Sequence, residues 1–225
     1  MIEFDKVAYS YSGADLLSDI SLRLQPGSFH FLTGPSGAGK STFLKLCYME
    51  LIASTGLVQI FGQDARGMGR DQIAAARRRI GVVHQDCKFL DHLSLRENVA
   101  LPLTVAGRDV ADSEADIKSL MDWVGLRDQQ QQRPPELSGG ERQRAALARA
   151  IIMDPDIILA DEPTGNVDWE MSQRLLSLLI ELNKLGKSVI VATHDMNLIR
   201  AAKAQVSARV LRIANHSLQL AGADL

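Results

Sequence analysis

The segment Gly34-Pro-Ser-Gly-Ala-Gly-Lys40-Ser41-Thr42 constrains the fold of this chain more than any other stretch. It matches the phosphate-loop pattern G-x-x-x-x-G-K-[ST], which needs a buried strand before it and a helix after it. Both are predicted, because residues 29–33 are apolar and residues 43–51 carry apolar side chains at helical spacing. The alternative is a glycine-rich turn that matches by chance, and the flanking strand and helix argue against it.

The residue types of this loop suit phosphate chemistry. Gly34, Gly37 and Gly39 would let backbone N–H groups turn toward phosphate oxygens at a helix N-terminus. Lys40 would supply a charge to the β- and γ-phosphates, and the Ser41 hydroxyl would ligate Mg²⁺. The predicted nucleotide contacts here are Gly34, Pro35, Ser36, Gly37, Ala38, Gly39, Lys40, Ser41 and Thr42.

Composition excludes several classes of protein. The 225 residues are 46% hydrophobic and 23% charged, as expected for a globular chain, and the net charge of −2 gives no general attraction for nucleic acid. The basic run 77–79 is interpreted as a solvated helix face, with contact to phosphate as the less favoured alternative. Cys47 and Cys87 lie in no metal-binding pattern, and both suit a reducing compartment.

The sequence shows no secretory signal and no membrane-spanning segment. The first residues lack the charged and then apolar pattern of a signal peptide. No apolar run approaches the roughly 20 residues that cross a bilayer. We therefore expect a cytoplasmic protein whose role at a membrane would come through a partner.

Strands and helices alternate along most of the chain, which predicts an α/β fold. Residues 2–11 and 16–25 alternate as an antiparallel pair would, and they form the expected N-terminal β subdomain. A mostly parallel core sheet is predicted from the strands that alternate with helices, among them 29–33, 80–84, 157–160 and 188–193. A further strand is predicted at 56–62, and residues 208–213 with those after 215–216 are predicted to form a terminal hairpin. Helices are predicted at 71–79, 91–103, 112–124, 142–153, 169–185 and 195–203, with Pro102 interrupting the second of them.

The domain organisation follows from where strands are missing. Residues 87–153 contain no convincing strand, so they are predicted to form a helical lobe inserted into the core of residues 1–86 and 154–225. The loop 129–135 is too short to link independent domains. The whole chain, 1–225, is therefore expected to be one domain.

Two carboxylates end the apolar strand 157–160. Such a strand would deliver Asp161 to the carboxyl edge of the sheet, where ligands bind in open α/β folds. There Asp161 could hold Mg²⁺ and Glu162 could polarise a water. The alternative is a solvated acidic turn, which the phosphate loop upstream makes less attractive.

The stretch Leu137-Ser-Gly-Gly-Glu141-Arg-Gln143 begins a predicted helix. Ser138 and Glu141 have the spacing of a capping box, which accounts for these two residues structurally. It does not account for Gly139 and Gly140, since glycine weakens the first turn of a helix. Two glycines there would let a phosphate approach the helix N-terminus.

These motifs, with Gln85 and His194 in the same order and spacing, resemble the ATPases of the ABC-transporter family over nearly the whole chain. The resemblance implies an Mg²⁺-dependent ATP hydrolase that pairs head to tail on ATP. Glu162 would be the general base, His194 would hold the γ-phosphate, and Gln85 would sense Mg²⁺ and the attacking water. The partner copy's nucleotide would be contacted by Ser138, Gly139, Gly140, Glu141 and, from the loop 164–168, Asp168.

The adenine contact has two candidates in this resemblance. Tyr11 matches the aromatic residue that stacks on the base, and Tyr9 competes with it. Tyr11 is preferred because it lies four residues after Val7, as the family pattern has it.

The segment 81–107, with Leu46-Cys-Tyr-Met49 and residues 160–168, is similar to the cell-division branch of the family. This implies an FtsX-like integral membrane partner, possible further division proteins, and a location on the cytoplasmic face of the bacterial inner membrane. His84 and Asp91 depart from the branch pattern beside the segment expected to touch that partner. The alternatives are the ATPase of a lipoprotein-release or macrolide-type exporter, and a soluble assembly factor that uses ATP as a switch.

Overall fold

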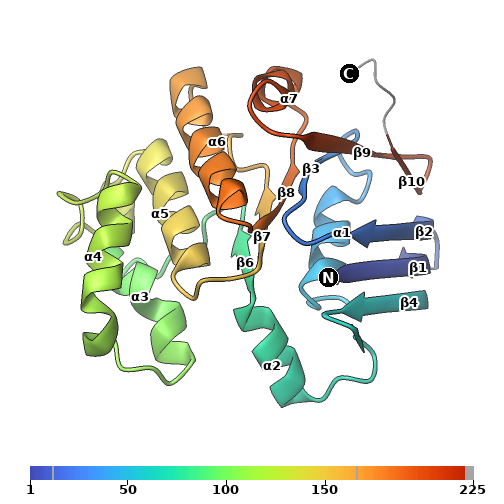
Figure 1. Ribbon diagram of the computed structural model, residues 1–225, viewed down its shortest axis with the longest axis horizontal. Helices are drawn as coiled ribbons and strands as arrows, with labels where there is room; N and C mark the ends of the chain where they lie inside the picture. The colour runs from blue at the N-terminus through green and yellow to red at the C-terminus, as the bar shows by residue number, and fades with distance from the viewer. Residues whose placement is uncertain (12, 166, 221–225) are drawn as a thin grey trace.

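The computed structural model describes residues 1–11, 13–165 and 167–220. Its strands are β1 (Ile2–Ser10), β2 (Asp15–Leu24), β3 (Phe29–Thr33), β4 (Thr55–Ile60), β5 (Gln63–Asp64), β6 (Ile80–Val83), β7 (Ile157–Asp161), β8 (Ser188–Ala192), β9 (Ala208–Ala214) and β10 (Ser217–Leu220). Its α-helices are α1 (Lys40–Cys47), α2 (Arg70–Arg78), α3 (Leu95–Val105), α4 (Glu114–Trp123), α5 (Gly139–Ile151), α6 (Trp169–Lys184) and α7 (Met196–Lys203). Figure 1 shows α3, α4 and α5 on one side of the central sheet and β1, β2 and β4 on the other.

The central sheet has six strands in the order β10-β9-β3-β8-β7-β6. All neighbouring pairs are parallel except β9 and β10, which form the terminal hairpin. The mostly parallel core sheet predicted from the sequence is therefore confirmed. Both of its faces are covered, which is why β7 and β8 read as unbroken apolar runs.

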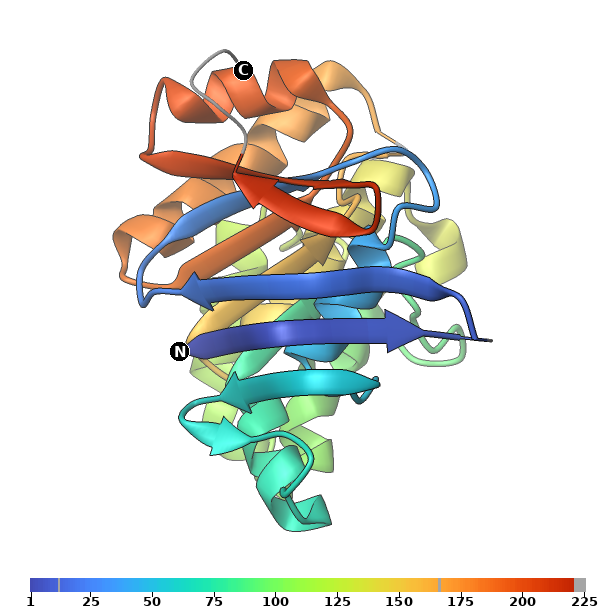
Figure 2. The ribbon, with the colours of Figure 1, turned by 90° about the vertical axis from the view of Figure 1, so that its right-hand side faces the viewer.

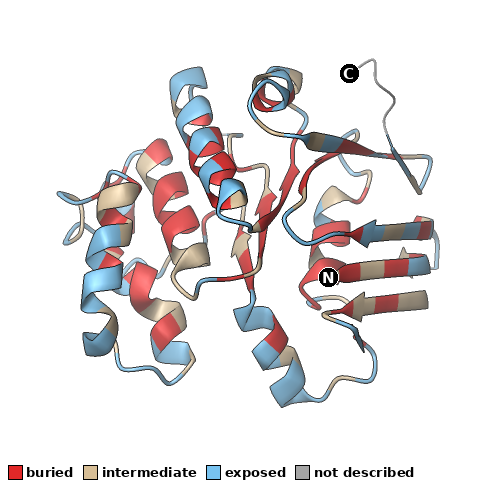
Figure 3. Cartoon of the chain, in the orientation of Figure 1, coloured by how far each residue is buried: buried red, intermediate tan, exposed pale blue. Residues whose placement is uncertain are grey.

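Two hydrophobic cores lie against the opposite faces of this sheet. Along β7, Ile158 and Ala160 pack with α3, α5, α6 and α7, whereas Ile157 and Leu159 pack with α1 and the antiparallel strands. Figure 3 colours most of β7 and all of β8 as buried, whereas α6 carries both buried and exposed residues. The alternation of β7 residues between the two cores follows from the pleat of the strand, which sends successive residues to opposite faces.

The second sheet is antiparallel, in the order β2-β1-β4-β5, and lies across α1 (Figure 2). Its contact with α1 includes the stacked rings of Phe4 and Phe43, whose centroids are 4.9 Å apart. The predicted N-terminal β subdomain is thus confirmed. The two-residue strand β5 was not predicted, because nothing in the pattern of residues 63–64 distinguishes it from the glycine turn before it.

Residues 87–153 hold α3, α4, α5 and two short 3-10 turns, Ala111–Ser113 and Pro134–Glu136, and no strand. Their buried side chains belong to the same core as those of α6 and α7. The boundaries of an inserted lobe at residues 87 and 153 stay a prediction.

The prediction that Pro102 interrupts a helix over 91–103 is wrong. The helix α3 begins after the Ser94 cap and continues through Pro102 to Val105. The proline removes one backbone bond, but Leu95, Val99 and Leu103 bury one face of α3 and hold the helix together.

The basic run 77–79, at the end of α2, is more than a solvated helix face. Arg77 donates to the carbonyls of Tyr48 (3.1 Å) and Met49 (2.8 Å) at the end of α1. Arg79 pairs with Asp156 at 2.6 Å. A charge pattern cannot reveal such bonds, because the carbonyl acceptors are present in every residue.

His30 lies buried in β3, 3% exposed, and its Nδ1 has no hydrogen-bond partner. Burial, with a smaller contribution from the charge of Arg209, lowers the His30 pKa from 6.5 to about 4. The unfolded chain therefore binds this proton more readily than the folded chain does. Burial of neutral His30 consequently costs no stability above pH 6.5, and the free energy of unfolding falls as the pH drops from 6.5 toward 4.

Between pH 7 and pH 4.5 we expect the wild type to lose about 2 kcal/mol more of its free energy of unfolding than His30→Leu. Urea unfolding at the two pH values measures this difference. Equal losses of the free energy of unfolding in the two proteins would mean that burial of His30 does not cause the acid sensitivity.

Candidate nucleotide-binding site

A cleft with a volume of about 580 Å³ lies at the carboxyl edge of the parallel sheet, where β3 passes through the phosphate loop into α1. Its position is the one expected for ligands of an open α/β fold. The cleft is lined by Leu16, Gly34, Pro35, Ser36, Gly37, Gly39, Lys40, Ser41, Thr42, Gln85, Asp161, Glu162, Gly165 and His194.

The loop has the backbone that a phosphate cradle needs. Gly39, immediately before α1, has φ +103°, and Gly34 has φ +150°. A side chain at Gly34 would place Cβ 2.7 Å from the carbonyl oxygen of Ile213. Lys40 folds back and donates to the Gly34 carbonyl at 3.0 Å, so its charge is held over the loop.

Glu162 lies between Lys40 and His194 in the cleft. Its Oε1 is 3.6 Å from Lys40 Nζ, and its Oε2 is 3.0 Å from His194 Nδ1. Since a carboxylate only accepts, Nδ1 of His194 carries the hydrogen. The Lys40 and Glu162 side chains are only 10% and 13% exposed, so solvent screens their interaction less than that of a surface pair.

The backbone at Glu162 explains how this carboxylate enters the cleft. Glu162 follows the last residue of β7 and has φ +46°, a conformation that is uncommon for a residue with a side chain. Its N–H donates to the Ala192 carbonyl at 2.9 Å, which ties the turn to β8. The turn thus directs Glu162 toward Lys40, and such backbone strain is typical of functional sites.

The residues suited to hold Mg²⁺ come together at the same edge. Asp161, Ser41 and Gln85 all line the cleft. Asp161 Oδ1 is buried and has no hydrogen-bond partner, which marks a place for a cation or a water. No group of three or more His, Cys, Asp or Glu suited to a metal occurs among the residues that the structure describes. The donors are therefore mixed oxygens, which suit Mg²⁺ shared with phosphates.

The predicted capping box at the start of α5 is confirmed. Glu141 N donates to Ser138 Oγ at 3.3 Å, and Ser138 N donates to Glu141 Oε2 at 2.8 Å. Hydrogen bonds from the Ser138 side chain and then its backbone hold the pKa of Glu141 below its usual range. The box satisfies two donors of the helix N-terminus.

The two glycines of α5 differ in their surroundings. Gly139 is exposed, whereas Gly140 is buried. A Cβ at Gly140 would lie 2.7 Å from Cγ of Met171, a residue in the first turn of α6. Packing inside the chain therefore accounts for the absence of a side chain at Gly140, in addition to any contact with phosphate.

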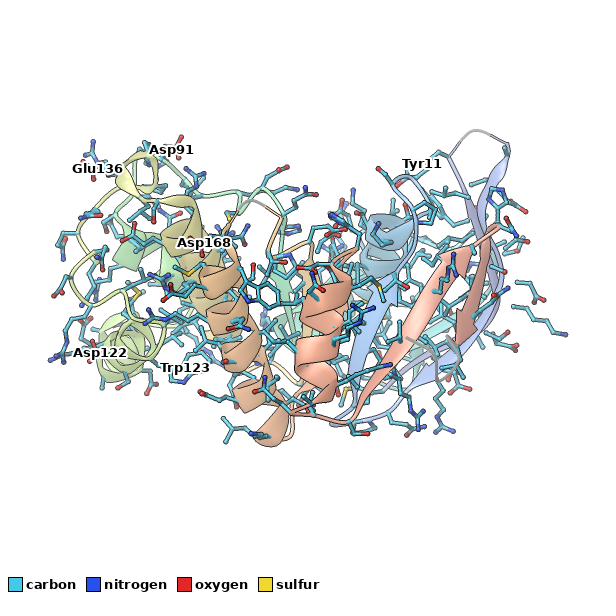
Figure 4. The ribbon with its side chains drawn as sticks, turned by 90° about the horizontal axis from the view of Figure 1, so that it is seen from above. Tyr11, Asp91, Asp122, Trp123, Glu136 and Asp168 are labelled. Carbon is cyan, nitrogen blue, oxygen red and sulfur yellow. The ribbon has the colours of Figure 1, made fainter. Side chains whose placement is uncertain are left out.

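One group of predicted nucleotide contacts does not line this cleft: Ser138, Gly139, Gly140, Glu141 and Asp168. Asp168 caps α6 and accepts from Met171 N at 2.8 Å. Figure 4 shows Asp168 on α6 and Tyr11 on the far side of α1, well separated across the molecule. Of the loop 164–168, residue 166 lies outside the described residues. The roles of this group stay predictions.

The aromatic candidates lie at the margin of the cleft. Tyr11 is 60% exposed, and its hydroxyl is 3.3 Å from Thr42 Oγ1. Tyr9 packs edge-to-face against Tyr11. Neither tyrosine nor Ala38 is among the lining residues, whereas Leu16, which sequence reasoning missed, is one of them. Leu16 belongs to no motif, so only its packing beside Gly39 could have revealed it.

The comparisons with known proteins agree with this geometry. The model of the ABC transporter family matches residues 17–165. The cell division ATP-binding proteins FtsE of Haemophilus influenzae and Escherichia coli K12 are 44% and 42% identical to the chain, over 89% and 88% of it and 93% and 90% of the relatives. The FtsE of Bacillus subtilis is 40% identical and covers 92% of both chains.

A solved structure has the same fold. The dimeric structure of a post-hydrolysis state of the ATP-binding cassette MJ0796, bound to ADP and Pi, superposes with a TM-score of 0.86. It is 30% identical and covers 98% of both chains. These matches confirm the family predicted from the motifs and the similarity to its cell-division branch. The chain therefore belongs to the ABC-transporter family as an ATP-binding cassette.

Proposed function

We propose that this chain is the ATP-hydrolysing subunit of a bacterial cell-division complex of the FtsEX type. ATP-driven dimerisation would be coupled to an FtsX-like membrane protein and would regulate cell-wall hydrolysis at the septum. The observation that carries the enzymatic part is the convergence of Glu162, Lys40 and His194 on one cleft. The biological part rests on the FtsE relatives.

In the proposed hydrolysis each group that lines the cleft has a role. Glu162 takes a proton from water as the water oxygen attacks the γ-phosphorus, and the bond from that phosphorus to the β-phosphate oxygen breaks. Lys40 and the loop amides stabilise the charge that moves onto the departing ADP. His194 orients Glu162 through their 3.0 Å contact and would hold the γ-phosphate.

A magnesium ion would be held by Ser41, Gln85 and Asp161, of which Asp161 brings a buried oxygen without a partner. Bound there with ATP, Mg²⁺ would neutralise charge on the β- and γ-phosphates. Gln85 would orient the attacking water beside Glu162.

Head-to-tail pairing of two copies on ATP supplies a use for the N-terminus of α5. Ser138, Gly139 and Glu141 are at least partly exposed and do not line the cleft of their own chain. An exposed helix N-terminus attracts phosphate, so a second copy's γ-phosphate is a suitable ligand. The relative MJ0796 forms dimers in its solved structures.

This chain has a groove that is suited to bind the proposed membrane partner. The groove has a volume of about 610 Å³ and lies between α2, β6, α3 and the end of α5. Its apolar lining includes Leu101, Pro102 and Val105, and Val105 is 79% exposed. The charged residues that line it, all within the described part of the chain, are the basic Arg77, Arg78, Lys88 and Arg149. This chemistry fits an apolar segment that carries acidic residues.

No described helix has the length and apolar character to cross a membrane. We propose that the chain lies on the cytoplasmic face of the inner membrane through its partner, and that other division proteins join the complex. Nothing in its charge favours nucleic acid.

The test is a pull-down of tagged Glu162→Gln with ATP from detergent-solubilised membranes of the source cell. An FtsX-like protein should be recovered. The Arg78→Glu change, added to this protein, should reduce the recovery at least about tenfold, because it places a negative charge in a basic groove. Lys118→Glu, which also replaces a basic residue by Glu but lies on the exposed face of α4, is the matched control. It should recover as much partner as the tagged Glu162→Gln protein does without a second change.

The other outcomes are equally informative. Recovery of a lipoprotein-release or export permease would keep the enzymatic assignment and replace the cell-division role. Recovery of no membrane protein, with tight ATP binding and no turnover by the wild type, would favour the soluble switch. Equal recovery by Arg78→Glu and Lys118→Glu would contradict the groove.

A further inference from the structure

The turn that follows Gln85 has an unusual backbone. Cys87 and Lys88 have φ values of +55° and +44°. Two consecutive residues with side chains in the left-handed region cost roughly 1–2 kcal/mol each. The turn therefore needs contacts that hold it, and it stands two residues from a side chain of the ATP site.

Arg149, near the end of α5, supplies these contacts. Its Nη1 donates to the Lys88 carbonyl at 2.8 Å, and its Nη2 donates to the Cys87 carbonyl. Its guanidinium also lies over the Phe89 ring, 4.5 Å from the centroid. One rigid group thus holds three consecutive residues, which a planar guanidinium with fixed donors can do.

A second residue of α5 holds the loop closer to the cleft. Gln143 Nε2 donates to the backbone carbonyl of Gln85 at 3.3 Å. The same helix begins at Gly139, after the Ser138 cap, where the nucleotide of the partner copy is proposed to bind. The proposed site for the partner's nucleotide and the Gln85 loop are therefore joined by one continuous helix.

We call the contacts of Arg149 with Cys87, Lys88 and Phe89 the Arg149 clamp. A second arginine of the chain makes similar contacts and serves for comparison. Arg77 holds the Tyr48 and Met49 carbonyls in a similar way, and Met49 also has a positive φ of 60°. The chain therefore uses forked arginines to hold left-handed residues in place. Both arginines line the basic groove, but Arg149 differs because the turn it holds adjoins Gln85 of the cleft.

We propose that Arg149 is a positioning residue that holds Gln85 in place for hydrolysis and links the groove to the ATP site. The inference rests on the proposed function. An acidic group bound in the groove would compete for the Arg149 donors, release the turn at Cys87 and Lys88, and so displace Gln85. Binding of a partner in the groove would thereby change turnover rather than ATP affinity.

The test compares four proteins: wild type, Arg149→Met, Gln85→Ala and the double variant. Arg149→Met should lower kcat about tenfold with little change in KM for ATP, since a small displacement of a positioned group costs this much or more. It should also raise the Mg²⁺ concentration needed for half-maximal rate. In the Gln85→Ala background the same change should lower kcat less than about twofold, because the residue it positions is gone.

The matched control is Arg66→Met. Arg66 also donates from Nη2 to a backbone carbonyl, that of Ala53 at 2.9 Å, but it follows β5 of the antiparallel sheet and lines neither the cleft nor the basic groove. Its kcat should equal that of the wild type. Circular dichroism and thermal melting of each variant separate a loss of kcat from a loss of fold.

Each outcome decides one question. If the wild type does not hydrolyse ATP, the proposed function fails. If the wild type is active but Arg149→Met keeps its kcat, or lowers kcat equally in both backgrounds, Arg149 has only a structural role and the inference is overturned. Should Arg149→Met prove unstable, Phe89→Leu, which weakens the same clamp from the other side, takes its place in the cycle with the same expected pattern.

Discussion

Glu162→Gln should lower ATP turnover by about 10²- to 10⁴-fold, because an amide cannot take the proton of the attacking water. ATP affinity should stay close to that of the wild type. The substituted amide can still bond to His194, and the change removes a carboxylate that lies 3.6 Å from Lys40. Single-turnover kinetics and equilibrium ATP binding measure the two quantities separately.

The same variant should accumulate as a dimer. If ATP drives the proposed pairing, a protein that binds ATP without cleaving it should shift from 24.6 kDa to twice that mass at saturating nucleotide. Light scattering with and without ATP measures the shift. A monomer at saturating ATP would argue against the predicted head-to-tail pairing, and undiminished turnover would remove Glu162 from its role as the base.

Lys40→Ala should weaken ATP binding by about 10²-fold, which is the second large effect. Lys40 is 10% exposed, and its charge is held over the loop by the Gly34 carbonyl and by Glu162. Removing one partner of a shielded charge contact costs on the order of 3 kcal/mol, which corresponds to that change in Kd. Titration of a fluorescent ATP analogue measures it, and hydrolysis should fall with it.

Lys45→Ala is the control for this change. Lys45 lies on the same helix and pairs with Glu50 at 3.2 Å, and its pKa is raised by that hydrogen bond. The pair is exposed, and exposed pairs contribute little. ATP binding by Lys45→Ala should be unchanged. Equal losses in both variants would mean that the general charge of α1, rather than Lys40, binds the phosphates.

The two variants separate binding from catalysis. Glu162→Gln is expected to lose turnover and keep ATP, whereas Lys40→Ala is expected to lose ATP first. The reverse pattern would mean that Glu162 mainly balances the charge of Lys40 in the cleft. The structure allows this contrast because one carboxylate contacts both Lys40 and His194.

Much of the fold could be predicted because its signals are local. The phosphate loop, the capping box of Ser138 and Glu141, and the apolar run of β7 each occupy fewer than ten neighbouring residues. Backbone geometry acts over the same distance, through i to i+4 bonds in helices and the alternation of strands. Pro102 shows the limit, since its local signal predicted a break that the buried face of α3 overrides.

The site required more than local signals. Sequence alone identified Lys40, Glu162 and His194 as candidates through their motifs, but not the distances between them. Those distances depend on β3, β7 and β8 lying side by side, which brings together residues far apart in the chain. Strand order is set by packing of the whole sheet. A motif can therefore identify a functional side chain and its neighbours in sequence, but not the distant residue that this side chain contacts in the folded protein.

The sequence by itself determined the class of fold, the phosphate loop and the residue types of the cleft, because these are written in contiguous segments. Only the tertiary structure decided that Met171 packs against Gly140, that His30 is buried without a partner, and that Arg149 holds a turn 61 residues away in sequence. Carbonyl acceptors and buried space carry no sequence signature. They exist only once the helices have packed on the sheet, and for that reason no pattern in the chain could have indicated them.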